Sequence, residues 1–443
     1  MSEKSTRRRF LSATGLAALG GMAGCVGTDS PPTERPLATK TPTSQSPQTP
    51  TPEPERYSDD PREFRGNLLH DPDDWSGWAA TSGRVTPTTE TTFLGTTSMR
   101  LNDTDGSAVR CVYDARDDPL DLQSTAICGA VRWDVPHAGV AFQMILVDGN
   151  GVRVRAPANA IASLGYMDDD WVMTEFGIAE EIDDEPIDLS NIVRLKLVFS
   201  NGPSAHTRVY VDNLRLVPFE PRRGAVLFTA DDGHPSQLSV MRSVLEEYGF
   251  GSTHFNMRTL TGGDRHMTAE QQRELAAAKD CFVCPHPQHP RSLPEMSDDE
   301  SRDALRAEYE FFASEEGLGL GHEHARYMSW PYGKSDAGTI DQAREFFDMG
   351  FNGTDKATTG WKNAAPMSIA RASFDSLQDL LSSLEIAERY GRVLIPQFHV
   401  FFDDRPTGGT NAKPADFRTF VEAVDAADVD VISAEEFFEV HTS

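Results

Sequence analysis

Lysine is scarce in this sequence. Only eight of the 41 basic residues are lysines, against 69 acidic residues, so the formal net charge is −28. Binding to nucleic-acid phosphates requires concentrated positive charge, which excludes nucleic acid as a partner. Self-repulsion on such an acidic surface is costly unless salt screens it. The composition therefore resembles that of halophilic proteins.

Cysteine is also rare. The five cysteines are Cys25, Cys111, Cys128, Cys281 and Cys284. Cys25 belongs to a targeting motif, which leaves four cysteines in what we interpret as an extracellular protein. Disulfides are compatible with this number without being implied by it. For the pair at 281 and 284, the intervening Phe and Val favour two buried thiols over a zinc cluster.

Two adjoining export signals occupy residues 1–25. The run Arg7–Leu11, followed by a short apolar stretch, resembles a Tat signal, and that stretch is too short to span a bilayer as a mature helix. Met22-Ala23-Gly24-Cys25 resembles a lipobox, which predicts cleavage before Cys25 and lipidation of its thiol. The mature chain is then expected outside the cytoplasm, at the cell surface, anchored to the membrane by lipid. Plain secretion with an unmodified cysteine is the alternative.

The next segment, residues 26–64, is expected to be a disordered linker. Its stretch TKTPTSQSPQTPTPEPE has almost no apolar side chains and cannot bury a core. Such a linker would hold the folded domains away from the membrane.

Residues 65–218 predict an all-β domain. Short runs with period-two patterning recur between polar turns, and no convincing long helix interrupts them. The runs lie at 98–101, 109–113, 128–133, 140–147, 171–176, 192–199 and 208–216. A jelly-roll-like β-sandwich is the natural solution.

Two roles remain open for this sandwich. Residues 209–216 resemble the last strand of many carbohydrate-binding modules, which implies a sugar-binding or docking role. A structural spacer is the other role. Four tryptophans are candidates for stacking on sugar rings, although packing is the favoured role for each: Trp75, Trp78, Trp133 and Trp171.

Residues 219–443 predict an α/β domain. Short apolar strands alternate with helices, which indicates parallel βαβ units and a closed or partly open barrel. Chemistry in such folds sits at the carboxyl ends of the strands. The polar residues expected at these ends are Asp231, Asp232, His286, His289, Arg371 and His399. Aspartate and histidine are typical ligands of divalent metals, and adjacent aspartates point in different directions, so one can bind metal while the other acts as a base.

Over residues 222–440, these strand ends resemble the polysaccharide deacetylases, the family-four carbohydrate esterases with a distorted (β/α) barrel. The family motif Thr-Phe-Asp-Asp-Gly stands here as residues 229–233, Thr-Ala-Asp-Asp-Gly. Residues 329–333, Ser-Trp-Pro-Tyr-Gly, are close to the Tyr-Pro-Tyr-Gly variant of many bacterial members. Residues 394–399 match the apolar strand that supplies the family's last histidine.

The resemblance implies a role for each residue of the site. Asp231 is the general base and Arg371 orients it. The metal ligands are Asp232, His286 and His289, with Zn²⁺ as the expected ion. His399 protonates the leaving group, and the backbone N–H of Tyr332, beside Trp330, holds the oxyanion.

Two departures from the family pattern bear on this site. The family spaces its two histidines four residues apart, whereas His286 and His289 are three apart. The usual arginine of the third motif is replaced by Ser329. Arg371 is positioned to supply that charge, because residues 369–371 resemble the arginine strand of the same variant subfamily.

The sequence therefore predicts a metal-dependent hydrolase that removes N- or O-acetyl groups from a polysaccharide. The irregular histidine spacing supports an alternative, a non-catalytic glycan-binding surface lipoprotein with a degenerate metal site. A glycosidase on the same barrel ranks last, since no matching pair of glutamates stands at the strand ends. Nothing in the sequence indicates the oligomeric state.

Overall fold

The computed structural model of the chain describes residues 56–102, 108–133, 141–159, 170–200, 208–287, 291–354, 356–404 and 407–443. The predicted signal peptide, Cys25 and most of the predicted linker lie outside these residues. Pro61–Phe64, at the end of the segment expected to be linker, form a 3-10 helix capped by the Asp60 side chain. No helix in the described ranges is both long and apolar enough to cross a membrane.

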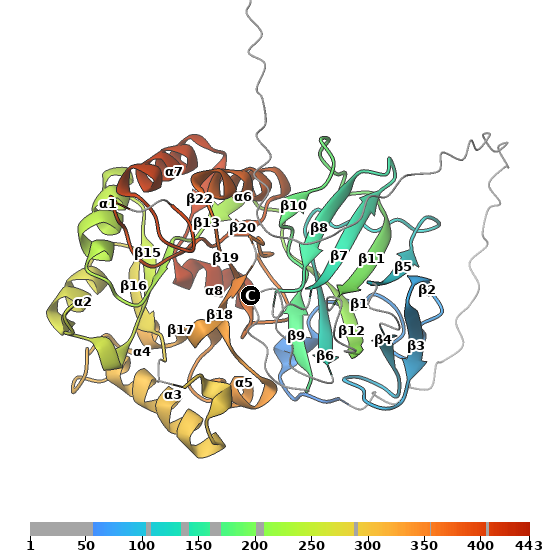
Figure 1. The fold of residues 1–443 in the computed structure, drawn as a ribbon, viewed down its shortest axis with the longest axis horizontal. Coiled ribbons are helices and arrows are strands. Elements are labelled where there is room, and N and C mark those ends of the chain that lie inside the picture. The colour runs from blue at the N-terminus through green and yellow to red at the C-terminus, as the bar shows by residue number, and fades with distance from the viewer. Residues whose placement is uncertain are drawn as a thin grey trace, which may run out of the picture. The chain divides into compact units, whose positions relative to one another are not determined.

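The described residues between 67 and 218 form two antiparallel sheets (Figure 1). The first sheet contains, in order, β3 (Arg84–Thr88), β4 (Ser98–Asn102), β12 (Arg208–Pro218), β6 (Thr125–Trp133) and β9 (Val172–Glu175), with β1 (Asn67–Leu68) paired to β12. The second contains β10 (Glu180–Glu181), β8 (Arg153–Pro157), β7 (Ala141–Asp148), β11 (Ile192–Ser200), β5 (Val109–Asp114) and β2 (Trp78–Ser82).

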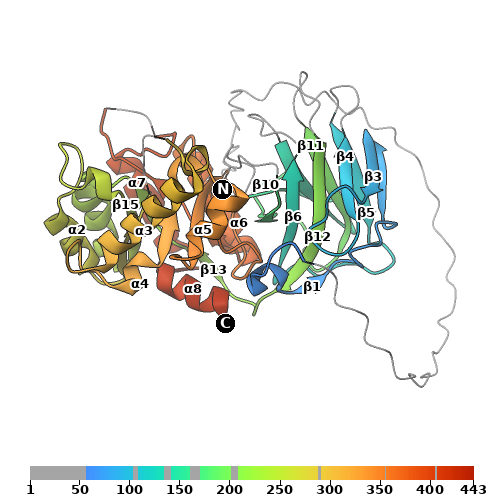
Figure 2. The ribbon, with the colours of Figure 1, turned by 90° about the horizontal axis from the view of Figure 1, so that it is seen from below.

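The core of this sandwich comes from alternate residues of both sheets. Val209 and Val211 of β12 pack in one buried cluster with Leu195 and Leu197 of β11, because side chains on a strand alternate between its faces. Figure 2 shows β6 beside β12, in agreement with their long antiparallel register. The four tryptophans named above are at most 8% exposed, so they pack inside the protein and are not presented to a sugar.

From residue 224 onward, parallel strands alternate with helices. The strands are β13 (Gly224–Val226), β14 (Thr229–Asp231), β15 (Ser252–Asn256), β16 (Cys281–Pro285), β17 (Tyr327–Ser329), β18 (Met349–Thr354), β19 (Ile369–Ala372), β20 (Val393–Leu394), β21 (Gln397–Phe398) and β22 (Val429–Val431). The helices are a π-helix (Gln237–Arg242), α1 (Ser243–Tyr248), α2 (Ala269–Ala276), α3 (Asp298–Ala313), α4 (His322–Ala325), α5 (Ala337–Ala343), α6 (Leu377–Tyr390), α7 (Pro414–Ala426) and α8 (Ala434–Thr442).

The expected mixed architecture is present, and among the described residues the ring of parallel strands is partly open. Among the described residues the parallel strands fall into three sheets, ordered β20-β13-β22, β16-β15-β14-β21 and β17-β18-β19. A parallel bridge between Ala372 and Pro396 links the third sheet to the strand of β20 and β21. No ladder joins β16 to β17 within the described ranges, so the ring of strands is open there.

The four cysteines other than Cys25 are buried and carry free thiols. Cys111 lies on β5 of one sheet and Cys128 on β6 of the other. Cys281 and Cys284 lie on β16, as two buried thiols.

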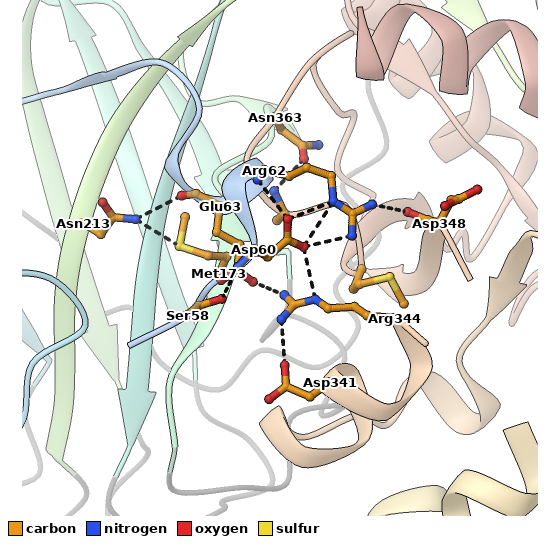
Figure 3. Close-up of polar contacts among 12 residues, drawn as sticks. Ser58, Asp60, Arg62, Glu63, Met173, Asn213, Asp341, Arg344, Asp348 and Asn363 are labelled. Carbon is orange, nitrogen blue, oxygen red and sulfur yellow. Dashed lines mark hydrogen bonds and ion pairs between the residues drawn. The ribbon is translucent and has the colours of Figure 1, made fainter. Parts of the chain in front are cut away.

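The segment that precedes the sandwich is tied to the α/β half by charged side chains. Figure 3 shows the Asp60 carboxylate between two arginines, with Arg62 Nη2 at 2.9 Å and Arg344 Nε at 3.3 Å. Arg344 follows α5 and also pairs with Glu63. Arg62 donates to the Asp348 carbonyl at 2.8 Å. The contacts made by Arg344 and by the Asp348 carbonyl join residues more than 280 positions apart in sequence, so they are tertiary contacts and not part of a local turn.

A buried glutamate at the end of β9 makes a second such connection. Glu175 accepts hydrogen bonds from the Thr359 hydroxyl, the Gly360 N–H at 2.7 Å and the Asn363 amide at 3.0 Å. Burial raises the pKa of the Glu175 carboxyl to about 7, although these hydrogen bonds and the Arg392 charge favour the ionised form. The loop after β18 is therefore held by a carboxyl group that titrates near neutral pH.

The raised pKa of Glu175 predicts that the stability of the protein depends on pH. The pKa in the folded protein, about 7, lies above the reference value of 4.5. The stabilisation from protonated Glu175 is therefore complete below the reference value and is lost as pH rises through about 7. The free energy of unfolding should fall by about 3 kcal/mol over this range. Glu175→Gln, which cannot ionise, should flatten the fall in unfolding free energy between about pH 5 and about pH 8, measured by denaturant titration.

The exposed Glu439→Gln on α8 is the matched control and should leave the pH slope as in the parent. If the unfolding free energy fell equally with pH in the parent and in Glu175→Gln, the assignment of this pH dependence to Glu175 would be contradicted.

Candidate active site

The site begins where β14 ends. Asp231 is the last residue of that strand and is 1% exposed. Asp232 and Gly233 then both adopt left-handed backbone conformations, with φ of 72° and 70°. This turn separates the two carboxylates, as expected from the sequence, and leaves about a third of the Asp232 side chain exposed. Any Cβ at position 233 would lie 3.0 Å from the Asn256 side chain, so glycine fits both the conformation and the space.

Asp231 is held by a buried ion pair. Arg371 on β19 donates from Nη1 to Oδ1 at 2.6 Å and from Nη2 to Oδ2 at 2.8 Å. Gln397 Nε2 and Ser329 Oγ donate to the same Oδ2, at 2.9 and 3.3 Å. Arg371 also donates to Ser329 Oγ at 2.7 Å. Serine at 329 therefore makes room for a guanidinium that comes from a different strand.

The charge of Asp231 follows from these partners. Burial alone would raise the pKa of the Asp231 carboxyl, but the charge of Arg371 and its hydrogen bonds outweigh that effect and hold the pKa below its ordinary value. Asp231 therefore remains ionised across the neutral range and can only accept a proton.

His286 faces Asp232 in an arrangement that suits a cation. Its Nδ1 lies 2.9 Å from the Ser329 carbonyl oxygen, which can only accept, so Nδ1 carries the proton. A neutral His286 then turns the lone pair of Nε2 toward Asp232 Oδ1, 3.5 Å away. Two electron-rich atoms face each other unless a positive charge lies between them. Ligands of a tetrahedral zinc stand roughly 3.3 Å apart, so this pair fits a divalent ion.

The third predicted ligand, His289, lies outside the described residues. Within the described ranges, no three His, Cys, Asp or Glu side chains gather closely enough to hold a metal. Asp232 and His286 are therefore the two residues of the expected ligand set that lie within the described ranges.

His399 lies opposite this pair. Its Nε2 is 4.0 Å from Asp231 Oδ2 and 4.0 Å from Asp232 Oδ2. A cavity of about 280 Å³ opens between these groups. Its wall consists of Asp231, Asp232, His286, Trp330, Pro331, Tyr332, Gly333, Gly353, Ser373, Gln397 and His399. Six of the predicted residues thus line one cavity, and Arg371 lies behind it.

The two aromatic residues of the third motif differ in exposure. Trp330 is 1% exposed, and its indole N–H donates to the Met367 carbonyl at 2.7 Å, so it supports the wall. Tyr332 is 58% exposed and has a φ of 58°. The short turn at Pro331–Gly333 presents Tyr332 at the mouth of the cavity.

Two glutamines belong to the site although the sequence analysis missed them. Gln397 lies two residues before His399, and the period of a strand places both on one face, a signal that was available. Gln237, in the π-helix after Asp231, donates to the backbone carbonyls of Asp231 and His399. No sequence pattern pointed to Gln237.

A buried relay orients the amide of Gln237. Gln237 Oε1 lies 3.0 Å from His254 Nδ1, and the carbonyl oxygen of an amide only accepts, so Nδ1 carries the proton. His254 Nε2 then accepts from the Ser252 hydroxyl at 2.8 Å. Burial lowers the pKa of His254 to about 3, which keeps this ring neutral. The amide of Gln237, held in one orientation by His254, thereby links the backbone carbonyls of Asp231 and His399.

The Asp231–Arg371 pair yields a stability prediction. Arg371→Met would leave a buried carboxylate without its cation and should lower the free energy of unfolding by about 3–5 kcal/mol at neutral pH. The double variant Asp231→Asn/Arg371→Met removes the stranded charge and should recover part of that loss. Denaturant titration of both variants and of Asp231→Asn alone completes the double-mutant cycle and measures this coupling. Additive losses would show that the two side chains act independently.

No protein-family model and no curated protein matches the chain. Among solved structures, it is similar to the Xyl-CE4 domain of a multidomain xylanase from the hindgut metagenome of Trinervitermes trinervoides, with 16% identity over 49% of this chain and 91% of that chain, and a TM-score of 0.33. The peptidoglycan deacetylase PdaC of Bacillus subtilis gives 13% identity, 50% and 93% coverage, and a TM-score of 0.33. A family 11 carbohydrate-binding module of a Clostridium thermocellum cellulase shows 16% identity over 34% of this chain and 94% of that chain, with a TM-score of 0.26. At these values the likenesses do not establish a family for this chain.

Proposed function

We propose that this protein is a metal-dependent hydrolase that removes acetyl groups from an extracellular or cell-surface polysaccharide. The observation that carries the proposal is the facing pair of Asp232 and His286, beside a carboxylate fixed by Arg371. Export by the Tat signal and a lipid anchor at Cys25 form part of the same proposal. They would place the site outside the cytoplasm, where its substrate is.

The residues around the cavity have complementary tasks. Asp231 stays ionised and immobile, so it accepts the proton of an attacking water in a fixed direction. His399, 4.0 Å from both carboxylates, is placed to deliver a proton to the departing amine or alkoxide. The backbone N–H of Tyr332 is the candidate donor to the oxyanion.

Asp232, His286 and His289 are the residues that would hold the metal. A divalent ion there would polarise the acyl carbonyl and make water more acidic. The His286 tautomer supports this assignment, because the Ser329 carbonyl fixes Nδ1–H and leaves Nε2 as a ligand atom.

The non-catalytic alternative rests on the three-residue spacing of His286 and His289. The spacing does not prevent His286 from facing Asp232, since their side chains lie 3.5 Å apart. Catalysis is therefore the function that the described geometry supports better. A protein that binds no metal would instead fit the alternative, a non-catalytic glycan-binding surface protein.

The proposal is tested by metal content and acetate release. We expect the full chain, purified in high salt, to hold near-stoichiometric zinc or a similar ion and to release acetate from an acetylated glycan. His286→Ala should lose the metal and the activity. His399→Gln should keep the metal but release acetate about 10²–10⁴-fold more slowly, because only the proton donor is missing.

The matched control is His322→Ala, which removes an exposed histidine on α4, and it should keep both properties. A parent chain that takes up no metal after loading with zinc, manganese or cobalt would sink the hydrolase proposal. Undiminished acetate release from His286→Ala would remove that residue from the mechanism.

A further inference from the structure

The outward face of the second sandwich sheet carries positive charge, in contrast to the rest of the chain. Leu195 and Leu197 of β11 point into the core, so the residues alternating with them point outward. The cations at outward positions of this sheet are Arg110 on β5, Arg153 and Arg155 on β8, and Arg194 and Lys196 on β11.

Two of these five cations, Arg110 and Lys196, have no carboxylate opposite them in the strand register, and Arg194 faces Asp114 without forming an ion pair with it. Arg153 pairs with Asp183 at 2.7 Å and Arg155 with Glu180 at 2.9 Å. Arg110, Arg194 and Lys196 form no ion pair with any residue in the described ranges. In a chain with 69 acidic and 41 basic residues, a sheet face with unpaired cations is unexpected.

The cations act on one another. Partial burial lowers the pKa of Lys196, and the charges of Arg194 and Arg153 lower it further. Arg194 and Lys196 lie two residues apart on one face of β11, so their like charges repel each other. An anion bound among these side chains would remove that repulsion.

The strand register places aliphatic residues between the cations. Lys196 pairs with Ile145 on one side and Val112 on the other, and Ile145 pairs in turn with Arg155. Strands are about 4.8 Å apart, so Lys196 and Arg155 stand about 10 Å from each other across Ile145. The next row places Val198 between Gln143 and Arg110. Figure 1 shows β8, β7, β11 and β5 in this order across the sheet.

We propose that this face binds an acidic polysaccharide. Its uronate or sulfate groups would pair with Arg110, Arg194 and Lys196, while the apolar faces of its sugar rings pack on Ile145, Val112 and Val198. The binding face is built from the sandwich strands alone, so glycan binding there does not depend on catalysis at Asp231.

Two other polyanions fit this face less well. Single-stranded nucleic acid is usually held by aromatic side chains that stack on its bases. No outward position among the described residues of β5, β7, β8 and β11 is aromatic. A net charge of −28 also opposes long-range approach to a duplex or to an anionic membrane. A single glycan chain can bind along one row of cations and aliphatic side chains and does not require a broad positively charged surface.

The test measures binding of the full chain to polygalacturonate and to chondroitin sulfate by calorimetry, with a neutral mixed-linkage glucan and poly-dT for comparison. The buffer contains about 1 M salt, which screens the long-range repulsion. We expect the parent to bind the acidic glycans and bind poly-dT more weakly. Arg194→Glu/Lys196→Glu should weaken acidic-glycan binding about tenfold or more, since charge-assisted contacts are lost.

Two further variants keep the test interpretable. Arg194→Gln/Lys196→Gln removes the charges without reversing them and should show a smaller loss in the same direction. Arg84→Glu/Lys279→Glu changes the net charge equally at sites away from this sheet, and it should bind as the parent does. Absence of acidic-glycan binding by the parent would overturn the proposal. So would an equal loss in the Arg84/Lys279 control, or poly-dT binding as tight as glycan binding. None of these outcomes depends on acetate release.

Discussion

The candidate active site depends on one buried ion pair, between Asp231 on β14 and Arg371 on β19. Both side chains are at most 1% exposed, and two short hydrogen bonds join them. An unpaired charge at that depth would cost several kcal/mol, so the two strand ends must stay in register for either charge to be tolerated. The pair thereby fixes the floor of the cavity, and the more exposed Asp232 remains available to a ligand.

Much of this arrangement was predictable from local patterns. Period-two runs located most strands of the sandwich, because one face of each strand is buried in a shared core. Strand ends located Asp231, Asp232, His286, Arg371 and His399, since parallel strands deliver their carboxyl ends to one side of the fold. The structure brings these five residues, which belong to or closely follow four separate strands, to one cavity or to the layer just behind it.

The missed features are long-range. Glu175 titrates near neutral pH because it is buried against a loop more than 180 residues away, which no local pattern reveals. Gln237 matters through two backbone carbonyls, and backbone groups leave no trace in the sequence. The sequence left open whether the barrel is closed or partly open, because pairing between β16 and β17 depends on the geometry of connections that propensity does not encode.

Salt reconciles an acidic protein with an acidic partner. At about 1 M ionic strength the Debye length is roughly 3 Å, so the field of the −28 charge fades within one side-chain length. A contact between a guanidinium and a carboxylate acts at about that distance and, when partly buried, is screened less. High salt therefore suppresses global repulsion more than it suppresses local pairing. Under those conditions the distribution of charge over one sheet face decides binding, and the net charge of the chain does not.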